Sequence, residues 1–202
     1  MNTPFAIAEV IGTVSFALSG YLVGSRKQLD LLGIAIVSML TAFGGGLVRD
    51  VICGRIPNAL RGPAPILLVS GTVVVAVLLR LHRRGEIERS RFFVLADAIG
   101  LAAFSISGAL TGLEAGLGFF GVVLLGFLTA AGGGIVRDTL VNEVPALLRS
   151  EFYGTVAIMT ASLVYLAQWL RLLHPAVLGA IFLFGLGLRL LAYARKWRLP
   201  TL

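Results

Sequence analysis

Two stretches of the chain repeat one another: Thr41–Asp50 reads TAFGGGLVRD and Thr129–Asp138 reads TAAGGGIVRD. The offset of 88 residues between them aligns further residues on both sides without a gap. The aligned pairs include Glu9/Asp97, Gly12/Gly100, Phe16/Phe104, Ser19/Ser107, Gly20/Gly108, Gly24/Gly112, Gly33/Gly121, Pro57/Pro145, Leu60/Leu148 and Arg61/Arg149. Chance does not produce a match of this length. The chain is therefore built from two related units.

The composition indicates a membrane environment. Of the 202 residues, 57% are hydrophobic and 13% are charged, and the mean hydropathy is +0.94. An ordinary soluble domain does not have this composition. A helix that spans a bilayer takes about 20 mostly apolar residues. We therefore expect an all-α integral membrane protein, with residues 1–202 forming a single transmembrane domain.

Hydropathy along the chain predicts seven transmembrane helices. They are expected at Phe5–Gly24, Leu29–Ile52, Ala64–Leu81, Phe92–Leu113, Gly116–Val141, Phe152–Leu170 and Pro175–Ala194. Repeat one then covers residues 5–81, repeat two covers residues 92–170, and the seventh helix at 175–194 follows them. Because each repeat has three spans, the second copy must be inverted relative to the first. Glu9 within the first apolar run, which lacks a preceding basic segment, favours a retained helix over a cleaved signal peptide.

The distribution of basic residues predicts the orientation. If the N-terminus lies outside, the inner side collects twelve of the 17 Lys and Arg residues and the outer side only three. The twelve are Arg26, Lys27, Arg80, Arg83, Arg84, Arg89, Arg91, Arg149, Arg189, Arg195, Lys196 and Arg198. Loops of membrane proteins on the cytoplasmic side are enriched in Lys and Arg. We therefore expect the N-terminus outside and the C-terminus in the cytoplasm, and the net charge of +7 does not indicate a nucleic-acid partner.

The scarcity of cysteine and histidine disfavours several classes of function. Cys53 is the only cysteine, and His82 and His174 are the only histidines, so a zinc or haem site is not expected. The G-x-G-x-x-G pattern at Gly116–Gly121 lies in an apolar run where no nucleotide-binding βαβ unit fits. No nucleophile and base can be paired by their positions. We expect no enzyme activity, no cofactor and no bound structural metal.

The glycine triplets that follow Thr41 and Thr129 are the most informative motif. The six residues are Gly44, Gly45, Gly46, Gly132, Gly133 and Gly134. Each glycine costs a helix about 1 kcal/mol relative to alanine, so we expect the second and fifth helices to break there. Irregular backbone at membrane depth is tolerated where it is buried in protein or lines a wet cavity. The alternative is that the glycines only let two helices approach closely.

Each triplet is followed by an Arg-Asp pair within the span, Arg49-Asp50 and Arg137-Asp138. An isolated charge there costs at least about 2.5–3.5 kcal/mol, so these residues must be paired or hydrated. Neighbouring residues on a helix point about 100° apart, so we do not expect Arg49 to bond Asp50. A pairing across the repeats, such as Arg49 with Asp138, is equally open. The pairs can line a pathway or hold a bend in the helix.

Other polar residues occupy equivalent positions in the two repeats. Glu9 and Asp97 lie near the starts of the first and fourth spans, where they can concentrate cations at two pore mouths or serve as interfacial carboxylates. Small hydroxyl residues form one polar stripe on each of these two helices. This stripe can line a wet lumen or hydrogen-bond within the bundle. The stripe residues are Ser15, Ser19, Ser107 and Thr111.

The doubled Gly-Gly-Gly-x-Val-Arg-Asp motif, the proline seven residues after each Asp and the three-plus-three-plus-one layout resemble a prokaryotic member of the trimeric intracellular cation channel family. This resemblance implies a homotrimer with one pore in each protomer, which conducts monovalent cations and prefers potassium. It implies that the second and fifth helices bend at the glycines, with the two Arg-Asp pairs beside the pathway. No Lys-containing motif for phosphoinositide matches.

The resemblance also implies the setting and the partners. They are the cell membrane of a bacterium or archaeon, membrane lipid, potassium or sodium ions, and further copies of the chain. The same sequence domain is also labelled a glycine transporter. A secondary transporter of a small solute such as glycine therefore remains the alternative, since inverted repeats suit a carrier as well as a channel.

Overall fold

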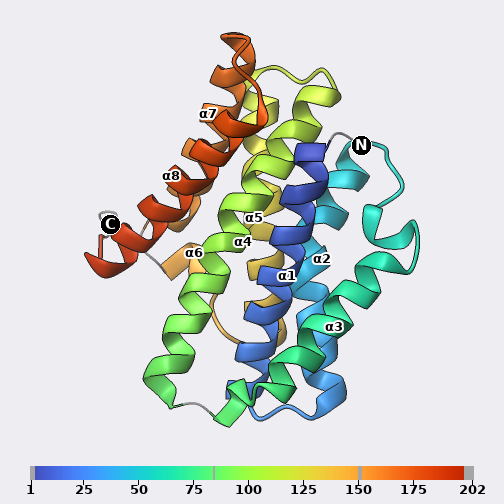
Figure 1. Cartoon of the computed structure of the whole chain (residues 1–202), viewed down its shortest axis with the longest axis vertical. Coiled ribbons are helices and arrows are strands. Elements are labelled where there is room, and N and C mark those ends of the chain that lie inside the picture. Colours follow the sequence, from blue (N-terminus) through green and yellow to red (C-terminus); the bar gives the residue numbers. More distant parts are fainter. Residues whose placement is uncertain (1–2, 84, 150–151, 198–202) are drawn as a thin grey trace.

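The computed structural model of the protein describes residues 3–83, 85–149 and 152–197, apart from the side chains of residues 86–89 and 149. Within these ranges the chain is helical and contains no strand (Figure 1). The helices are α1 (Thr3–Arg26), α2 (Leu31–Ile52), α3 (Ala64–Leu78), α4 (Glu86–Glu114), α5 (Phe119–Leu140), α6 (Ala146–Arg149), α7 (Tyr153–Trp169) and α8 (Pro175–Ala194), with 3-10 turns η1 (Asn58–Leu60) and η2 (Leu81–Arg83). The expected all-α class is confirmed.

The seven longer helices coincide with the seven expected segments, and α6 is an additional four-residue helix in the loop before α7. By length and hydropathy, five of the described helices can cross a membrane: α1, α2, α5, α8 and the Ser90–Glu114 part of α4. The helices α3 and α7 are shorter, at 15 and 17 residues. The count of seven transmembrane spans therefore stays a prediction.

Local chemistry sets several helix ends. The Asp30 side chain accepts a hydrogen bond of 2.7 Å from the backbone N–H of Gly33 and caps α2. Gly116, with φ of +70°, ends the turn after α4, a conformation that costs glycine little. The expected third span extended to Leu81, but α3 ends at Leu78 and Arg80 adopts a left-handed φ of 52°.

Equivalent helices of the two repeats meet at the centre of the molecule. Helices α1 and α4 pack side by side and run in opposite directions, with α2 and α5 against them (Figure 1). The rings of Phe16 and Phe104 stack edge to face with centroids 5.1 Å apart. Gly12 lies under the Phe104 ring and Gly100 under the Phe16 ring, where a Cβ would approach ring carbons within 2.7 and 2.2 Å. The centre is therefore a contact between residues related by the internal repeat.

The glycine triplets do not interrupt the helices. Both α2 and α5 continue as α-helix through Gly44–Gly46 and Gly132–Gly134, so the expected helix breaks are not confirmed. A Cβ at Gly45 would lie 1.9 Å from the Thr129 carbonyl oxygen, and one at Gly133 would lie 2.1 Å from the Thr41 carbonyl oxygen. The glycines instead let α2 and α5 cross with backbone against backbone, as small residues do between membrane helices.

Ion pairs join the repeats at both ends of the bundle. At one end Arg26 and Lys27 each contact Glu143 at 2.8 Å, and at the other Arg55 contacts Glu114 at 3.1 Å. The offset of 88 residues relates Arg26 to Glu114 and Arg55 to Glu143. Equivalent positions of the two repeats therefore form an ion pair at each end, but the basic residue at one end corresponds to the acidic residue at the other. It follows that the C-terminal ends of α1 and α5 lie together, and that the C-terminal ends of α2 and α4 lie together.

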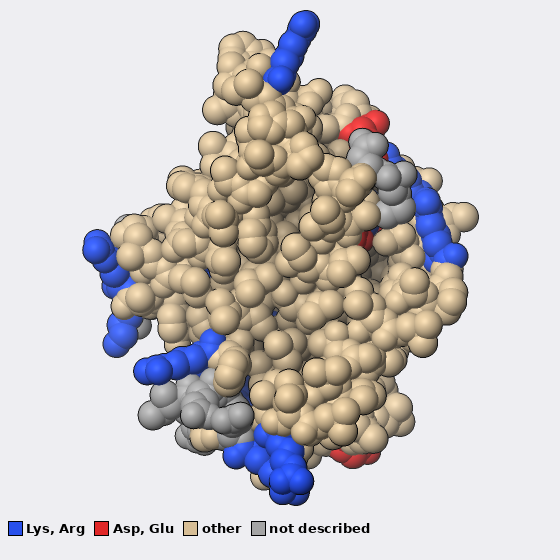
Figure 2. Space-filling view, in the orientation of Figure 1, with Lys and Arg blue, Asp and Glu red and all other residues tan. Residues whose placement is uncertain are grey.

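Many large hydrophobic side chains are exposed on the surface, whereas one basic residue of the orientation count is buried. Figure 2 shows a face whose middle is nearly free of charged side chains, with Lys and Arg projecting near its margins. Arg189 was counted among the cytoplasmic residues, but it is only 6% exposed and its guanidinium lies 4.9 Å from the Tyr153 ring centroid. This residue must be removed from the count. Arg84 and Arg198 lie outside the described residues.

The helix crossing predicts a specific response to substitution. Gly133→Ala places a methyl group against the Thr41 carbonyl and the Phe16 ring, so α2 and α5 must separate. We expect a loss of stability of about 1–3 kcal/mol from overpacking, seen as a lower unfolding temperature in detergent. Gly71→Ala in α3 is the matched control, because nothing lies within 4 Å of its Cβ position. Equal unfolding temperatures for the two variants would contradict the crossing.

The ion pairs of Glu143 with Arg26 and Lys27 predict that the stability of the fold depends on pH. The hydrogen bond from Lys27, with the nearby charge of Arg26, holds the pKa of Glu143 below its ordinary value, although burial opposes this. A lowered pKa contributes stability that is present above the ordinary carboxyl pKa and is lost as the pH falls through the lowered pKa. Glu143 is partly exposed, so we expect less than about 1 kcal/mol. The difference in unfolding temperature between the wild type and Glu143→Gln should shrink from about pH 6 to about pH 3; a constant difference would contradict it.

Candidate functional site

Two fully buried arginines lie beyond the glycine crossing, Arg49 on α2 and Arg137 on α5, both 0% exposed. Each is three residues after the last glycine of its triplet, so it lies on nearly the same helix face one turn further on. A Cβ at Gly46 would lie 3.8 Å from Nη2 of Arg49, and one at Gly134 would lie 3.7 Å from Nη2 of Arg137. The third glycine of each triplet therefore lies directly beside the guanidinium of its own helix.

Arg49 binds partners on three helices. Its Nε donates to Oδ1 of Asp50 at 2.8 Å, and its Nη1 donates to Glu9 on α1 and to the Ser107 hydroxyl on α4. Nη2 makes a longer hydrogen bond of 3.3 Å to the second oxygen of Glu9. The Ser107 hydroxyl donates in turn to Glu9. The guanidinium thus connects the first two helices of its own repeat to the first helix of the other.

Arg137 has the equivalent set of partners. Its Nε donates to Oδ1 of Asp138 at 2.8 Å, and its Nη1 donates to Oδ1 of Asp97 at 2.7 Å and to the Ser19 hydroxyl. Each of these residues lies 88 positions from its counterpart around Arg49. We call the two groups the repeat-one cluster (Glu9, Arg49, Asp50 and Ser107) and the repeat-two cluster (Asp97, Arg137, Asp138 and Ser19).

The second oxygen of each aspartate holds the loop that follows its helix. Oδ2 of Asp50 accepts from the backbone N–H of Asn58, and Oδ2 of Asp138 accepts from that of Ala146, both at 2.8 Å. These backbone groups begin η1 and α6. Each aspartate therefore joins its arginine to the start of the next element.

The observed partners correct one expectation and decide one alternative that the sequence left open. Arg49 does bond Asp50, because its long side chain turns back far enough for Nε to reach the adjacent carboxylate. The pairing of Arg49 with Asp138 does not form, since each arginine takes its carboxylates from its own repeat and only a serine from the other. Glu9 and Asp97 are 9% and 3% exposed and lie in buried ion pairs, so a role at pore mouths stays a prediction.

The small hydroxyl residues lie inside the bundle. Ser19 and Ser107 bind the arginines, as described, and Thr111 donates to the Ser107 carbonyl at 3.0 Å. Thr41 and Thr129 donate to carbonyls one turn back in their own helices. Ser15 is 8% exposed. Apart from Ser15, these residues form hydrogen bonds within the helix bundle of the described structure, and a role in lining a lumen stays a prediction.

Two residues near the repeat-two cluster were missed by the sequence reasoning. Tyr153 at the start of α7 is 2% exposed, and the Arg189 guanidinium stacks on its ring. The charge of Arg189 within the apolar seventh segment was a usable signal, because a charge at that depth needs a partner. Tyr153 gave no signal, since a tyrosine at a helix start is also common at a membrane surface.

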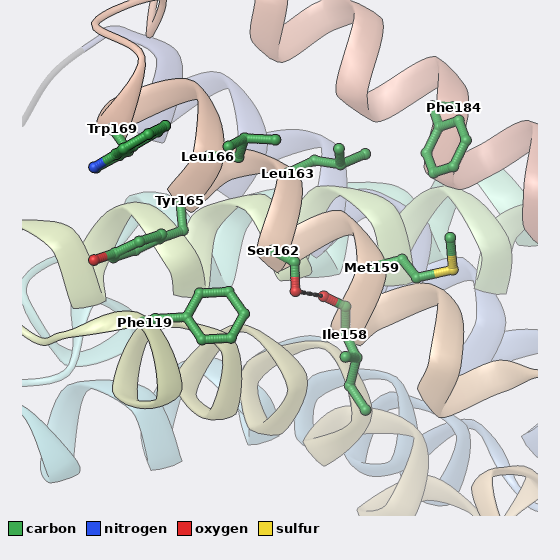
Figure 3. A pocket seen from close by; sticks show the side chains of 9 residues that line it. All are labelled: Phe119, Ile158, Met159, Ser162, Leu163, Tyr165, Leu166, Trp169 and Phe184. Carbon is green, nitrogen blue, oxygen red and sulfur yellow. Dashed lines mark hydrogen bonds between the residues drawn. The ribbon is translucent and has the colours of Figure 1, made fainter.

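Grooves on the described surface and a small cavity lie near these helices. A cavity of about 20 Å³ lies beside Arg49, and a groove of about 460 Å³ between α1 and the start of α3 adjoins it. A second groove, of about 540 Å³, lies between α5, α7 and α8 and is lined mostly by apolar side chains (Figure 3). The Ser162 hydroxyl in it is bound to the Ile158 carbonyl. No group of three or more His, Cys, Asp or Glu side chains in the described ranges could hold a metal ion.

The duplicated three-helix fold with buried charge clusters defines a polytopic integral membrane protein. The chain belongs to the family described as "Glycine transporter", which matches residues 6–81 and 94–169, once in each repeat. The UPF0126 membrane protein of Deinococcus radiodurans is 39% identical over 167 residues, covering 78% of this chain and 74% of that protein. YvgT of Bacillus subtilis, also a UPF0126 membrane protein, is 34% identical over 198 residues, covering 96% and 95%.

Solved structures agree with this assignment. A prokaryotic TRIC channel crystallised in 0.5 M KCl has a TM-score of 0.91 and 29% identity, covering 98% of this chain and 100% of that one. The TRIC trimeric intracellular cation channel orthologue from Rhodobacter sphaeroides has a TM-score of 0.89 and 32% identity, covering 96% and 99%. The resemblance inferred from the doubled motif is confirmed.

The buried clusters predict that removing one of their charges strongly lowers the stability of the fold. Arg137→Gln leaves Asp97 and Asp138 without their cation, and breaking a buried pair costs about 3–5 kcal/mol. We expect a markedly lower unfolding temperature in detergent, which Asp97→Asn added to the same chain should partly restore. Arg171→Gln, at an exposed arginine, should change stability by less than about 0.5 kcal/mol. Wild-type stability of Arg137→Gln would show that the ion pairs are not structural.

Proposed function

We propose that the protein is a passive monovalent-cation channel that prefers potassium and has one pore in each protomer of a homotrimer. The observation that carries this proposal is the match along nearly the whole chain to solved proteins described as TRIC cation channels, at TM-scores of 0.91 and 0.89. The trimer is supported by the description of the Rhodobacter sphaeroides protein as trimeric. A channel needs no chemical step, and none is proposed.

The proposed pathway runs through the centre of the protomer, between α1, α2, α4 and α5. The two clusters lie on either side of the crossing at Gly45 and Gly133, and their carboxylate and hydroxyl oxygens are the kinds of ligand that alkali cations take in place of water. At the crossing each glycine is covered by a carbonyl of the facing helix. This arrangement is a closed one, and conduction requires α2 and α5 to move apart.

The proposed topology places the two repeats inverted in the membrane, with the N-terminus outside and the C-terminus in the cytoplasm of a bacterium or archaeon. The exchanged ion pairs at the two ends support the inversion. The excess of basic residues on one set of loops supports the orientation, and it survives removal of Arg189 from the count.

A secondary transporter is the second candidate, and the description of the family as glycine transporters favours it. Two inverted repeats around a central contact can also expose one site to each side in turn. A small amino acid would then bind between the carboxylates and an arginine. The two functions differ in their kinetics, because a channel passes ions in discrete current steps and a carrier shows saturable exchange.

Reconstitution in a planar bilayer distinguishes the two functions. With a potassium gradient across the bilayer, the wild-type protein should give discrete current steps that reverse near the potassium equilibrium potential. The physical reason is that a continuous pore lets each ion follow its own gradient. Liposomes from the same preparation should show no counterflow of labelled glycine above that of empty liposomes. Glycine counterflow without current steps would overturn the channel and support the transporter.

A further inference from the structure

The two clusters have the same polar residues but different neighbours. Positions related by the offset of 88 residues carry small or polar residues around the repeat-one cluster and larger apolar residues around the repeat-two cluster. The three pairs are Thr13/Leu101, Ala59/Leu147 and Pro65/Tyr153. In the opposite direction, Phe43 faces the first cluster where Ala131 stands in repeat two. The duplication therefore keeps the ion pairs and changes the space around them.

The repeat-two side is filled by larger side chains. Leu101 and Tyr153 are 0% and 2% exposed, and Leu147 packs against the same apolar core. Arg189 of α8, which has no counterpart in repeat one, brings a second guanidinium against the Tyr153 ring. A second positive charge thus lies against Tyr153, while Arg137 bonds both carboxylates, Asp97 and Asp138.

The repeat-one side contains the cavity of about 20 Å³ and an excess of negative charge. The cavity is lined by Glu9, Thr13, Asp50 and Asn58, among others, and Arg49 is the one basic residue on its wall among those described. Two carboxylates here face one guanidinium, which leaves one uncompensated negative charge in a buried place. A buried charge without a partner costs several kcal/mol. A cation in the cavity would supply the missing charge.

Oxygen atoms for such a cation are present. Thr13 is 8% exposed, lines the cavity, and has no hydrogen-bond partner among the described residues. One oxygen of Glu9 accepts only a long hydrogen bond of 3.3 Å from Arg49, so it keeps lone pairs for another partner. The cavity and this unpartnered hydroxyl are independent observations that indicate a ligand at the same place.

The cavity has a route to the surface. Glu9, Thr13, Asn58 and Pro65 line both the cavity and the groove of about 460 Å³ beside it. Arg61 also lines this groove; it is exposed, and its Nε donates to the Ile56 carbonyl. Because its guanidinium can remain at the surface, it does not occupy the cavity.

We propose that the repeat-one cavity binds one monovalent cation, with Glu9, Asp50 and Thr13 as its oxygen ligands, and that the repeat-two side has no such site. This site rests on the proposed function, because it is the point at which a permeating ion first sheds water on the repeat-one side. A volume of about 20 Å³ holds one ion or molecule of about the size of water. Divalent cations bind six or more oxygens or keep several waters, and this space does not accommodate them.

The experiment uses purified wild-type protein in detergent, with potassium chloride replaced by choline chloride at constant total chloride. Potassium should raise the unfolding temperature in a saturable manner, because it binds only the folded state. Thr13→Leu introduces the residue that repeat two carries and should raise the half-saturating potassium concentration by about tenfold or more. Thr72→Val on α3 is the matched control, because its hydroxyl bonds only within its own helix, to Leu68.

Each outcome decides the proposal. Potassium-specific stabilisation that Thr13→Leu loses and Thr72→Val keeps supports the site. Equal stabilisation by choline, or an unchanged potassium dependence in Thr13→Leu, overturns it. If Thr13→Leu does not fold, infrared difference spectra of the wild type between potassium and choline replace it. A perturbed carboxylate stretch then supports the site, and an unperturbed one overturns it.

The same preparation separates this proposal from the proposed function. Current steps in a bilayer without potassium-specific stabilisation would retain the channel and reject the site. Stabilisation lost in Thr13→Leu, but without current steps, would retain the site and reject the channel. The cation would then be the coupling ion of a transporter.

Discussion

The contact between α2 and α5 is the constraint on which the rest of the structure depends. At Gly45 and Gly133 each helix presents bare backbone to a carbonyl oxygen of the other, and no side chain larger than hydrogen fits between them. This separation brings Arg49 and Arg137 within reach of serines from the opposite repeat. These serines lie on α4 and α1, which pack against α2 and α5, so the close packing of the glycines and the binding of the charges belong to the same contact between the repeats.

The arginine clusters show how one duplicated set of contacts can diverge. Glu9 contacts two nitrogens of Arg49, whereas the shorter Asp97 contacts only Nη1 of Arg137. Nη2 of Arg137 consequently has no hydrogen-bond partner among the described residues. One methylene group thus decides whether a carboxylate holds the guanidinium by two atoms or by one. The backbone contacts of Asp50 and Asp138 are unaffected, because they lie on the other side of each arginine.

The sequence predicted the repeat, the seven longer helices and the need to pair the intramembrane charges, because these follow from composition and period. It did not predict the partners of Arg49, since these depend on how helices cross. It also predicted breaks at the glycine triplets, because a local helix propensity of about 1 kcal/mol for each glycine was weighed without the packing that offsets it. Arg189 was misplaced for a related reason: a charge near a helix end resembles a loop charge until the ring of Tyr153 is seen beside it.

The seventh long helix has a consequence for symmetry. Two equivalent repeats alone would give two equivalent clusters, and a pathway through them would be the same from either end. Helix α8 has no partner in the repeat and contributes Arg189 to one side only. Tyr153 stands where repeat one has Pro65, so Tyr153 and Arg189 fill the repeat-two side, whereas the repeat-one side keeps a small cavity lined by Glu9 and Asp50. The difference between the two sides of the protein therefore comes from the helix that was not duplicated, together with substitutions between the duplicated parts such as Pro65/Tyr153 and Thr13/Leu101.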